Sequence, residues 1–499
     1  MGQVKHQRPP YGIIAVLMIG AFIAFLNNTL LNVALPSMMA DLNVGPATIQ
    51  WLTTGFMLVN GILIPTTAYL IQKYSVRRLF LVAMGLFTIG TIVAGTATIF
   101  PILLIARMVQ ASGSAIMMPV LNNVMLISFP IEKRGAAMGV FGLILMFAPA
   151  IGPTLSGWIV EHYNWRALFH FVTPIAATVF IIGFFLLKDK KDRVEMKLDS
   201  FSLLLSSVGF GGLLFGFSNA GENGWTSVMV TIPLVLGIIS IVVLILRQLR
   251  LFEPMLNFRV YKYPMFALSS AITMITNMAM FSGMLLLPIY VQSLRGISPM
   301  DSGLMLLPGA LANAFMSPIN GRLFDKYGGR ILAIIGLSIL VVTTYFFSEL
   351  TFETSYTSLM ILHAIRMFGI SMVFMPVSTN GLNQLPRKMY PHGVAVNNTL
   401  NQVAGAIGTA VMVTIMSSRQ EVYTDRMIAA AGGTVTKIAE QQIKAKAMLE
   451  GINDAFYIAT IFATISLVLS FFIKRSTPAD EQLSQEQDAE KVRGKLAAE

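Results

Sequence analysis

Fourteen predominantly apolar stretches run through this sequence of 499 residues, each close to the roughly 20 residues that cross the hydrocarbon core of a bilayer as a helix. The first is not a cleavable signal peptide, because it lacks a small-residue cleavage site and thirteen more stretches follow it. The sequence therefore predicts an all-α, multi-pass membrane protein with 14 transmembrane helices. These are centred on residues 12–34, 50–71, 79–98, 101–122, 136–159, 167–187, 200–218, 229–247, 265–290, 302–321, 331–348, 358–380, 393–416 and 455–473.

The composition excludes several other classes of protein. Apolar residues make up 55% of the chain and charged residues only 12%, about half of the roughly 25% that soluble domains carry. A water-soluble enzyme of this length needs a more polar surface. The 33 Phe and 32 Met bury too readily for a disordered chain. Because cysteine is absent, disulfides, thiolate metal sites and a cysteine nucleophile are excluded.

The positions of the basic residues predict the orientation. With a cytoplasmic amino terminus, 26 of the 35 Lys and Arg fall on the inner side and 7 on the outer side, as the positive-inside rule requires. We therefore expect both termini in the cytoplasm. The net charge of +11 reflects this topology, so nucleic acid is not expected as a partner.

An internal repeat predicts the domain organisation. Leu70 aligns with Leu323 at an offset of 253, and in both places Lys-Tyr follows three residues later; the same offset places Gly152 on Gly405. Parallel six-helix repeats around a midplane site are an architecture of transporters. We expect an N-terminal bundle (1–187), a linker with two inserted helices (188–262), a C-terminal bundle (263–475) with an outer loop (417–453), and a cytoplasmic tail (476–499).

Four motifs in the expected helices and order carry a family resemblance. Leu26–Pro36 is similar to L-D-x-T-x-x-N-V-A-L-P, Arg107–Gly113 to R-x-x-Q-G-x-G, Ala148–Gly157 to G-x-x-x-G-P-x-x-G-G, and Gly321–Arg330 to G-x-L-x-D-R-x-G-R. The chain thus resembles the major facilitator superfamily, in its fourteen-helix drug:proton antiporter branch (EmrB/QacA-type), over nearly its whole length.

The resemblance implies a secondary active transporter of the plasma membrane that exports drug-like amphiphilic compounds by alternating access, in exchange for protons. The branch is mostly bacterial. Its partners would be a small amphiphile, protons and the lipid bilayer, with no cofactor, no metal and no evident obligate protein partner. No enzyme activity is expected.

Two motifs predict moving parts. The small residues of helix 5 share one flank, where a neighbouring backbone approaches closely, and Pro153 removes a backbone donor. We interpret Gly152, Pro153 and Gly157 as a pivot, with plain packing as the alternative. The loop after helix 10 predicts a cytoplasmic gate in which Asp325 accepts charge-assisted bonds. The gate residues are Gly321, Arg322, Asp325, Lys326 and Arg330; in the first repeat Gln72 replaces the Asp, which predicts a weaker gate there.

The carboxylate that this branch carries in helix 1 is replaced by Asn27. The resemblance implies that the carboxylate serves proton coupling and attracts cationic drugs, and an amide releases no proton at physiological pH. No other Asp or Glu falls in the middle of a predicted helix. We therefore expect a neutral-to-positive midplane cavity, lined by Asn27, Asn28, Asn32, Arg107, Asn277, Asn313, Asn397 and Gln402.

Such a cavity favours neutral or anionic cargo, because a desolvated cation finds no counter-charge there. Arg107 itself costs roughly 2.5–3.5 kcal/mol in a membrane-spanning helix unless it has partners or a wet cavity, and Arg366 poses the same question. If protons are coupled, the carrier lies at a helix end or is a histidine. The candidates are Glu222, Asp301, His363 and Asp454, each with capping or interfacial contacts as the alternative role.

Two other functions stay open. An acid-free cavity also suits a lipid, a lipid-linked precursor or a nucleotide-like anion as exported cargo. A membrane-embedded enzyme would need convergent nucleophile and base groups or metal ligands, and the five His are scattered along the chain. The outer segment 417–453 is expected to be helical in part, as a spacer or a lid over the exit.

Overall fold

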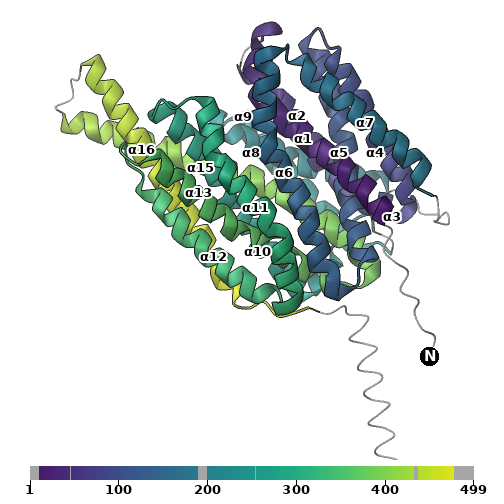
Figure 1. The fold of residues 1–499 in the computed structure, drawn as a ribbon. Helices are drawn as coiled ribbons and strands as arrows, with labels where there is room; N and C mark the ends of the chain where they lie inside the picture. The colour runs from purple at the N-terminus through teal and green to yellow at the C-terminus, as the bar shows by residue number, and fades with distance from the viewer. Residues whose placement is uncertain (1–10, 45, 189–198, 253, 432–435, 477–499) are drawn as a thin grey trace, which may run out of the picture.

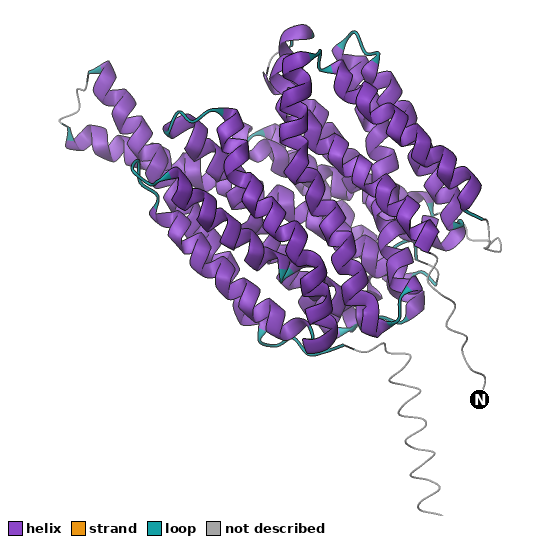
Figure 2. Cartoon of the chain, in the orientation of Figure 1, coloured by secondary structure: helices purple, strands orange, loops and turns teal. Residues whose placement is uncertain are grey.

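The computed structural model describes residues 11–44, 46–188, 199–252, 254–431 and 436–476. The described residues form helices joined by short turns, with no strand among them (Figure 2). Thirteen of these helices or helix pairs are long and apolar enough to cross a membrane. The 29-residue helix α6 completes the expected fourteen, so the predicted all-α, multi-pass fold is confirmed.

The helices follow the predicted order along the chain. The first six segments are α1 (Tyr11–Asp41), α2 with α3 (Pro46–Leu63 and Thr67–Lys73), α4 (Val76–Gly95), α5 (Phe100–Ser128), α6 (Arg134–His162) and α7 (Arg166–Leu186). The inserted pair is α8 (Ser200–Asn223) and α9 (Val228–Arg250). The last six are α10 (Pro264–Ile289), α11 (Pro299–Tyr327), α12 (Gly329–Phe346), α13 with α14 (Tyr356–Ser371 and Phe374–Asn383), α15 (Tyr390–Ala430) and α16 (Lys437–Ser470).

Each set of six helices has its own apolar core. The largest buried cluster draws its members from Ile14 to Leu187, and two further clusters draw theirs from Ile272 to Ile473. A further buried cluster joins Ala68 and Leu126 of the first half to Phe266 and Tyr390 of the second. Helices α6 and α11 run side by side where the halves meet (Figure 1). The inserted pair packs through α8 on α2 and α15.

Prolines interrupt the two membrane-spanning segments that consist of helix pairs, α2 with α3 and α13 with α14. Pro65 lies in the 3-10 turn between α2 and α3. Pro376 lies near the start of α14, where its missing N–H leaves the carbonyl of Met372 without the usual helical partner. Both breaks fall inside membrane-spanning segments that run toward the end that carries most Lys and Arg. We call this end the basic end, and the positive-inside rule assigns it to the cytoplasm.

The outer segment 417–453 is helical on both sides of its tip, as expected. Helix α15 continues to Ala430, and α16 begins again at Lys437. This helical hairpin extends away from the bundle at the upper left of Figure 1, beyond the outer ends of the C-terminal helices. At its base, Asp454 accepts hydrogen bonds from Arg419 Nε at 2.5 Å and from Tyr423 Oη at 3.1 Å.

Candidate functional site: a cavity between the two halves

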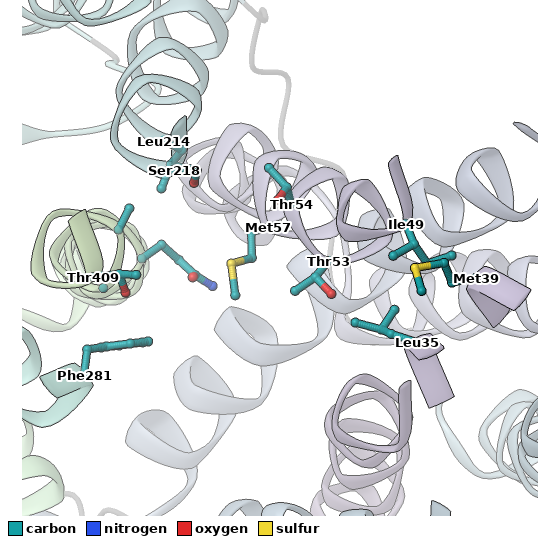
Figure 3. A pocket seen from close by; sticks show the side chains of 13 residues that line it. Leu35, Met39, Ile49, Thr53, Thr54, Met57, Leu214, Ser218, Phe281 and Thr409 are labelled. Atoms are coloured by element: carbon teal, nitrogen blue, oxygen red, sulfur yellow. The ribbon is translucent and has the colours of Figure 1, made fainter. Parts of the chain in front are cut away.

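A cavity of about 610 Å³ lies between the two halves. Its wall comes from α1 and α2 on one side, α10 and α15 on the other, and the inserted helix α8 (Figure 3). All the lining side chains are uncharged. They are Leu35, Met39, Ile49, Thr53, Thr54, Met57, Leu214, Ser218, Phe281, Gln402, Gly405, Ala406 and Thr409.

The cavity occupies the outer half of the membrane-spanning region. Helices α1, α8 and α10 start at the basic end, and their cavity residues come from the later part of each helix, whereas those of α15 lie near the middle of its membrane-spanning stretch. Helix α2 starts at the opposite end and contributes residues from its first part, including Thr53 and Met57. The hydroxyl and amide groups of Thr53, Thr54, Ser218, Gln402 and Thr409 provide the polar contacts on an otherwise apolar wall.

At the basic end, Asp325 joins the two halves. Its carboxylate accepts hydrogen bonds from the backbone N–H groups of Gly135 and Ala136, both at 2.8 Å. These donors belong to the first turn of α6, where the helix dipole favours a negative charge. Asp325 thus contacts a helix N-terminus, and its role as a cytoplasmic gate stays a prediction. Arg475 also donates to the Asp325 carbonyl oxygen at 2.8 Å.

A row of glycines in α6 brings the halves into close contact at this end. A Cβ added at Gly135, Gly139 or Gly142 would overlap Gly321, Ser317 or Pro318 of α11. Close backbone approach through small residues is the usual way in which membrane helices pack. This glycine row was not predicted from the sequence, although its spacing of four and three residues places all three glycines on one face of a helix.

Arg134 adds a second contact between the halves, which was also not predicted from the sequence. Its Nη1 donates to Asn383 Oδ1 and to Tyr390 Oη, both at 2.9 Å, and its guanidinium lies 4.9 Å from the centroid of the Tyr390 ring. In the first-half counterpart of the gate, Gln72 Nε2 lies 3.1 Å from His392 Nε2 in α15. The contacts of Asp325, Arg134 and Gln72 therefore separate the cavity from the basic end.

Of the three predicted pivot residues, Gly152 makes its close contact inside the N-terminal half. A Cβ there would overlap Thr29 of α1, whereas a Cβ at Gly157 would meet nothing within 4 Å. The side chain of Pro153 lies outside the described part of the chain. The contact between the halves falls on the other glycine row of α6, so the pivot role of Gly152 stays a prediction.

Arg107 joins a polar network within the N-terminal half. The buried guanidinium donates to Gln110 Oε1 at 2.9 Å and to Asn28 Oδ1 at 3.0 Å, and Asn27 Nδ2 donates to the same Gln110 oxygen at 3.3 Å. The ring of Phe56 lies 4.5 Å from the guanidinium carbon. Three sequence-predicted residues thus come together with Gln110, which the prediction omitted. All the partners observed for Arg107 are neutral.

Arg366 has a matching place in the C-terminal half. Its Nη2 donates to the carbonyl of Ala279 at 2.8 Å and its Nε to Thr344 Oγ1 at 3.3 Å. His363, one turn earlier, is 2% exposed, and its Nδ1 has no hydrogen-bond partner among the described residues. The partners observed for Arg366 are thus neutral groups, as they are for Arg107.

Of the eight predicted cavity residues, the structure places Gln402 on the cavity wall. Asn277 donates to the Asn401 carbonyl at 2.9 Å, and Asn397 accepts from Ser270 Oγ at 2.7 Å, so both are engaged between helices. Asn313 is buried in α11, and the side chain of Asn32 lies outside the described part. Contact of these residues with cargo stays a prediction.

The three candidate proton carriers whose side chains are described lie on different helices. Asp301 is exposed at the start of α11 and exchanges two hydrogen bonds with Ser298 Oγ, which is the arrangement of a helix cap. Asp454 pairs with Arg419 at the outer hairpin. His363 is buried beside α11, where a Cβ at Gly309 would overlap its ring. The side chain of Glu222 lies outside the described part.

Comparison with known proteins matches residues 17–409 to the family described as Major Facilitator Superfamily. The lincomycin resistance protein LmrB of Bacillus subtilis is 45% identical and covers 93% of this chain and 95% of its own. The multidrug export protein EmrB of Haemophilus influenzae is 25% identical over 92% of this chain and 94% of its own. The crystal structure of the human organic anion transporter MFSD10 superposes with a TM-score of 0.66 at 14% identity, covering 93% of this chain and 100% of that one.

Proposed function

The chain belongs to the major facilitator superfamily, and on that premise we propose that it exports neutral or anionic drug-like amphiphiles by alternating access, in exchange for protons. It is a multi-pass transporter of the plasma membrane and not an enzyme. The proposal concerns what the transporter carries and what drives it.

The observation that carries the proposal is the uncharged wall of the cavity between the halves. A cation entering it would lose hydration without gaining a carboxylate, which is costly in a medium of low dielectric. A neutral amphiphile avoids that cost. Its apolar part would contact Met57 and Phe281, and its polar groups would meet the hydroxyl and amide groups of the wall.

The relatives support an exporter of small molecules. The names of LmrB and EmrB refer to lincomycin resistance and to multidrug export. This chain spans nearly the whole length of both proteins. The contacts at the basic end support alternating access, since breaking the Asp325 and Arg134 contacts would open the cavity inward.

The test uses everted membrane vesicles with an imposed pH gradient and three size-matched fluorescent amphiphiles, one cationic, one neutral and one anionic. We expect gradient-driven uptake of the neutral and anionic probes and little uptake of the cation. Vesicles without the protein provide the baseline. Uptake of the monovalent cationic probe that persists in the Arg107→Gln variant would contradict the cargo preference. Uptake of the neutral probe that does not depend on the pH gradient would contradict proton exchange.

The carrier of the proton is tested in the same vesicles. Glu222→Gln, Asp301→Asn, His363→Gln and Asp454→Asn are compared with the exposed control Glu353→Gln. Loss of gradient-driven uptake in one of the four, with uptake down a substrate gradient preserved, would identify the carrier. If uptake stayed fully coupled to the pH gradient in all four variants, none of the named residues would be the proton carrier.

A second candidate function is export of a lipid, a lipid precursor or a nucleotide-like anion. The buried guanidinium of Arg107, whose observed partners are neutral, favours a phosphate-bearing cargo, since Arg pairs well with phosphate. In the vesicle assay, uptake of a labelled anionic lipid in place of all three drug-like probes would favour this alternative.

A further inference from the structure

A second cavity, of about 440 Å³, lies nearer the basic end, between the inserted helices and α15. Its wall is almost wholly hydrocarbon. The main contributors are Phe210 and Leu213 of α8, Ile241 and Ile245 of α9, and Leu400 and Val403 of α15. The hydroxyl of Thr399, which also lines the cavity, already donates to the Ala395 carbonyl at 2.8 Å. A polar group placed here would be desolvated without a partner, whereas a hydrocarbon chain would not.

This cavity differs from the one between the halves. The two lie on opposite sides of a short stretch of α15, where Gln402 lines the first and Val403 the second. On α8, Leu214 lines the first and Leu213 the second. The first cavity offers hydroxyl and amide groups, and the second offers hydrocarbon, so the two favour different ligands.

Basic residues follow three of the residues that line the second cavity, and one of them contacts its wall. The cavity-lining residues Leu249, Phe258 and Tyr261 are each next in sequence to a basic residue, namely Arg250, Arg259 and Lys262. Arg259 Nη2 donates to the Leu249 carbonyl at 2.9 Å, which places this guanidinium against the cavity wall. Arg250 and Lys262 are exposed. Arg247, one turn earlier, is already paired with Asp199.

The connection between α9 and α10 also contains a residue that is typical of contact with the membrane surface. Phe252 follows the last turn of α9 and is 95% exposed. A fully exposed aromatic ring beside basic side chains is typical of a segment that lies at the lipid interface. The cytoplasmic leaflet presents anionic lipids at this level, and they attract Lys and Arg.

We propose that the second cavity binds one acyl chain of an anionic phospholipid from the inner leaflet, whose phosphate contacts Arg259 and lies near Arg250 and Lys262. The hydrocarbon wall fits the chain and the basic rim fits the head group. Because α8, α9 and α15 all contribute to the wall, the bound lipid stabilises the packing of the inserted pair on the C-terminal half. The proposal does not depend on which cargo the transporter exports.

The head-group part is tested by native mass spectrometry of the purified full chain, titrated with phosphatidylglycerol or with phosphatidylcholine of the same acyl chains. We expect phosphatidylglycerol to be retained in preference. Arg259→Gln should weaken that retention about fivefold, the effect of one basic residue at an anionic surface, and leave phosphatidylcholine unchanged. Lys388→Gln, an exposed lysine elsewhere at the basic end, is the control. Equal retention of both lipids would overturn the proposal.

The acyl-chain part is tested with Ile245→Trp, which fills the cavity. We expect it to lose both lipids, whereas Ile239→Trp, on an exposed part of the same helix, should retain them. Normal lipid retention by Ile245→Trp would overturn the proposal, and so would altered drug transport with unchanged lipid retention, because the cavity would then hold cargo. If Ile245→Trp does not unfold cooperatively, it is not properly folded, and the proposal is then judged by the lipid preference of Arg259→Gln.

Discussion

At the scale of single residues, the two buried arginines show how neutral groups hold a cation inside a membrane protein. Arg107 and Arg366 are fully buried, in equivalent helices of the two halves. Each donates to amide, hydroxyl or carbonyl oxygens, and each keeps one nitrogen without a partner among the described residues. With carboxylates absent from these contacts, the positive charge is stabilised without being neutralised. This supports a preference for neutral or anionic cargo.

Replacing Gly283 by Ala tests how tightly the second arginine is packed. A Cβ at this position would overlap Arg366 Nη1, so the guanidinium must move away from its partners. Overpacking of a well-packed core costs about 1–3 kcal/mol, and we expect a clear fall in the thermal midpoint of the detergent-solubilised protein. Gly157→Ala is the matched control, because nothing lies within 4 Å of its Cβ. Equal midpoints for the two variants would contradict the packing described here.

At the scale of helices, Asp199 both caps α8 and joins it to α9. Its carboxylate accepts a hydrogen bond from the backbone N–H of Phe201 at 3.2 Å and pairs with Arg247 Nε at 2.8 Å. The hydrogen bond from Arg247, with a smaller contribution from Ser202, lowers the pKa of Asp199 to about 2. The start of one inserted helix is thus held to the end of the other by a charged group.

This pairing predicts a pH dependence. Because the pKa is lowered on folding, the stabilisation is complete above the unfolded value of 3.8 and is lost as the pH falls toward 2. Asp199→Asn keeps a capping side chain but should cost about 1 kcal/mol at pH 6, because solvent screens this partly exposed pair. Chemical unfolding in detergent at pH 6 and at pH 3 measures it. The difference between variant and wild type should shrink at the lower pH; an unchanged difference would mean that the charge contributes nothing.

Helix positions were predictable from the sequence, while contacts between helices were less so. The membrane requires every spanning segment to be apolar and about 20 residues long, so α1 through α16 follow the predicted stretches. The contact of Asp325 with a helix N-terminus was expected from the resemblance of Gly321–Arg330 to the superfamily motif and from the attraction between a carboxylate and such an end. Its role as a gate stays a prediction. The glycine row of α6 was missed, since glycines 135 and 139 lie before and at the start of the apolar run and resemble ordinary helix packing residues.

At the scale of the whole molecule, the polar residues of the spanning helices explain why the cavity itself was only partly predicted. Asn27, Asn277 and Asn397 were expected on its wall, yet each is engaged in contacts with other helices. A sequence shows that such a residue needs a partner, but not whether the partner is a helix or a ligand. The wall that is observed combines Thr, Ser and Met with aliphatic and aromatic side chains, and none of these residue types is distinctive within an apolar helix.

The arrangement of the halves predicts how they move. The contact of α6 with α11 at the basic end depends on Gly139, where a Cβ would overlap the Ser317 carbonyl and Pro318. Gly139→Val should separate the halves there, and Asp325→Asn should weaken the same contact by removing its charge. Rigid halves that separate at one end approach one another at the other, so the cavity should close toward the outside.

Spin-label distances measure this motion directly, because the chain has no native cysteine. Labels at 78 and 388 report the basic ends of the two halves, and labels at 164 and 353 report the outer ends. Both variants should lengthen the first distance and shorten the second. Gly157→Val, on the same helix with open space at its Cβ, should change neither. If Gly139→Val lengthened the first distance and left the second unchanged, the halves would bend rather than rock, and closure of the cavity would need a separate movement of α2 or α15.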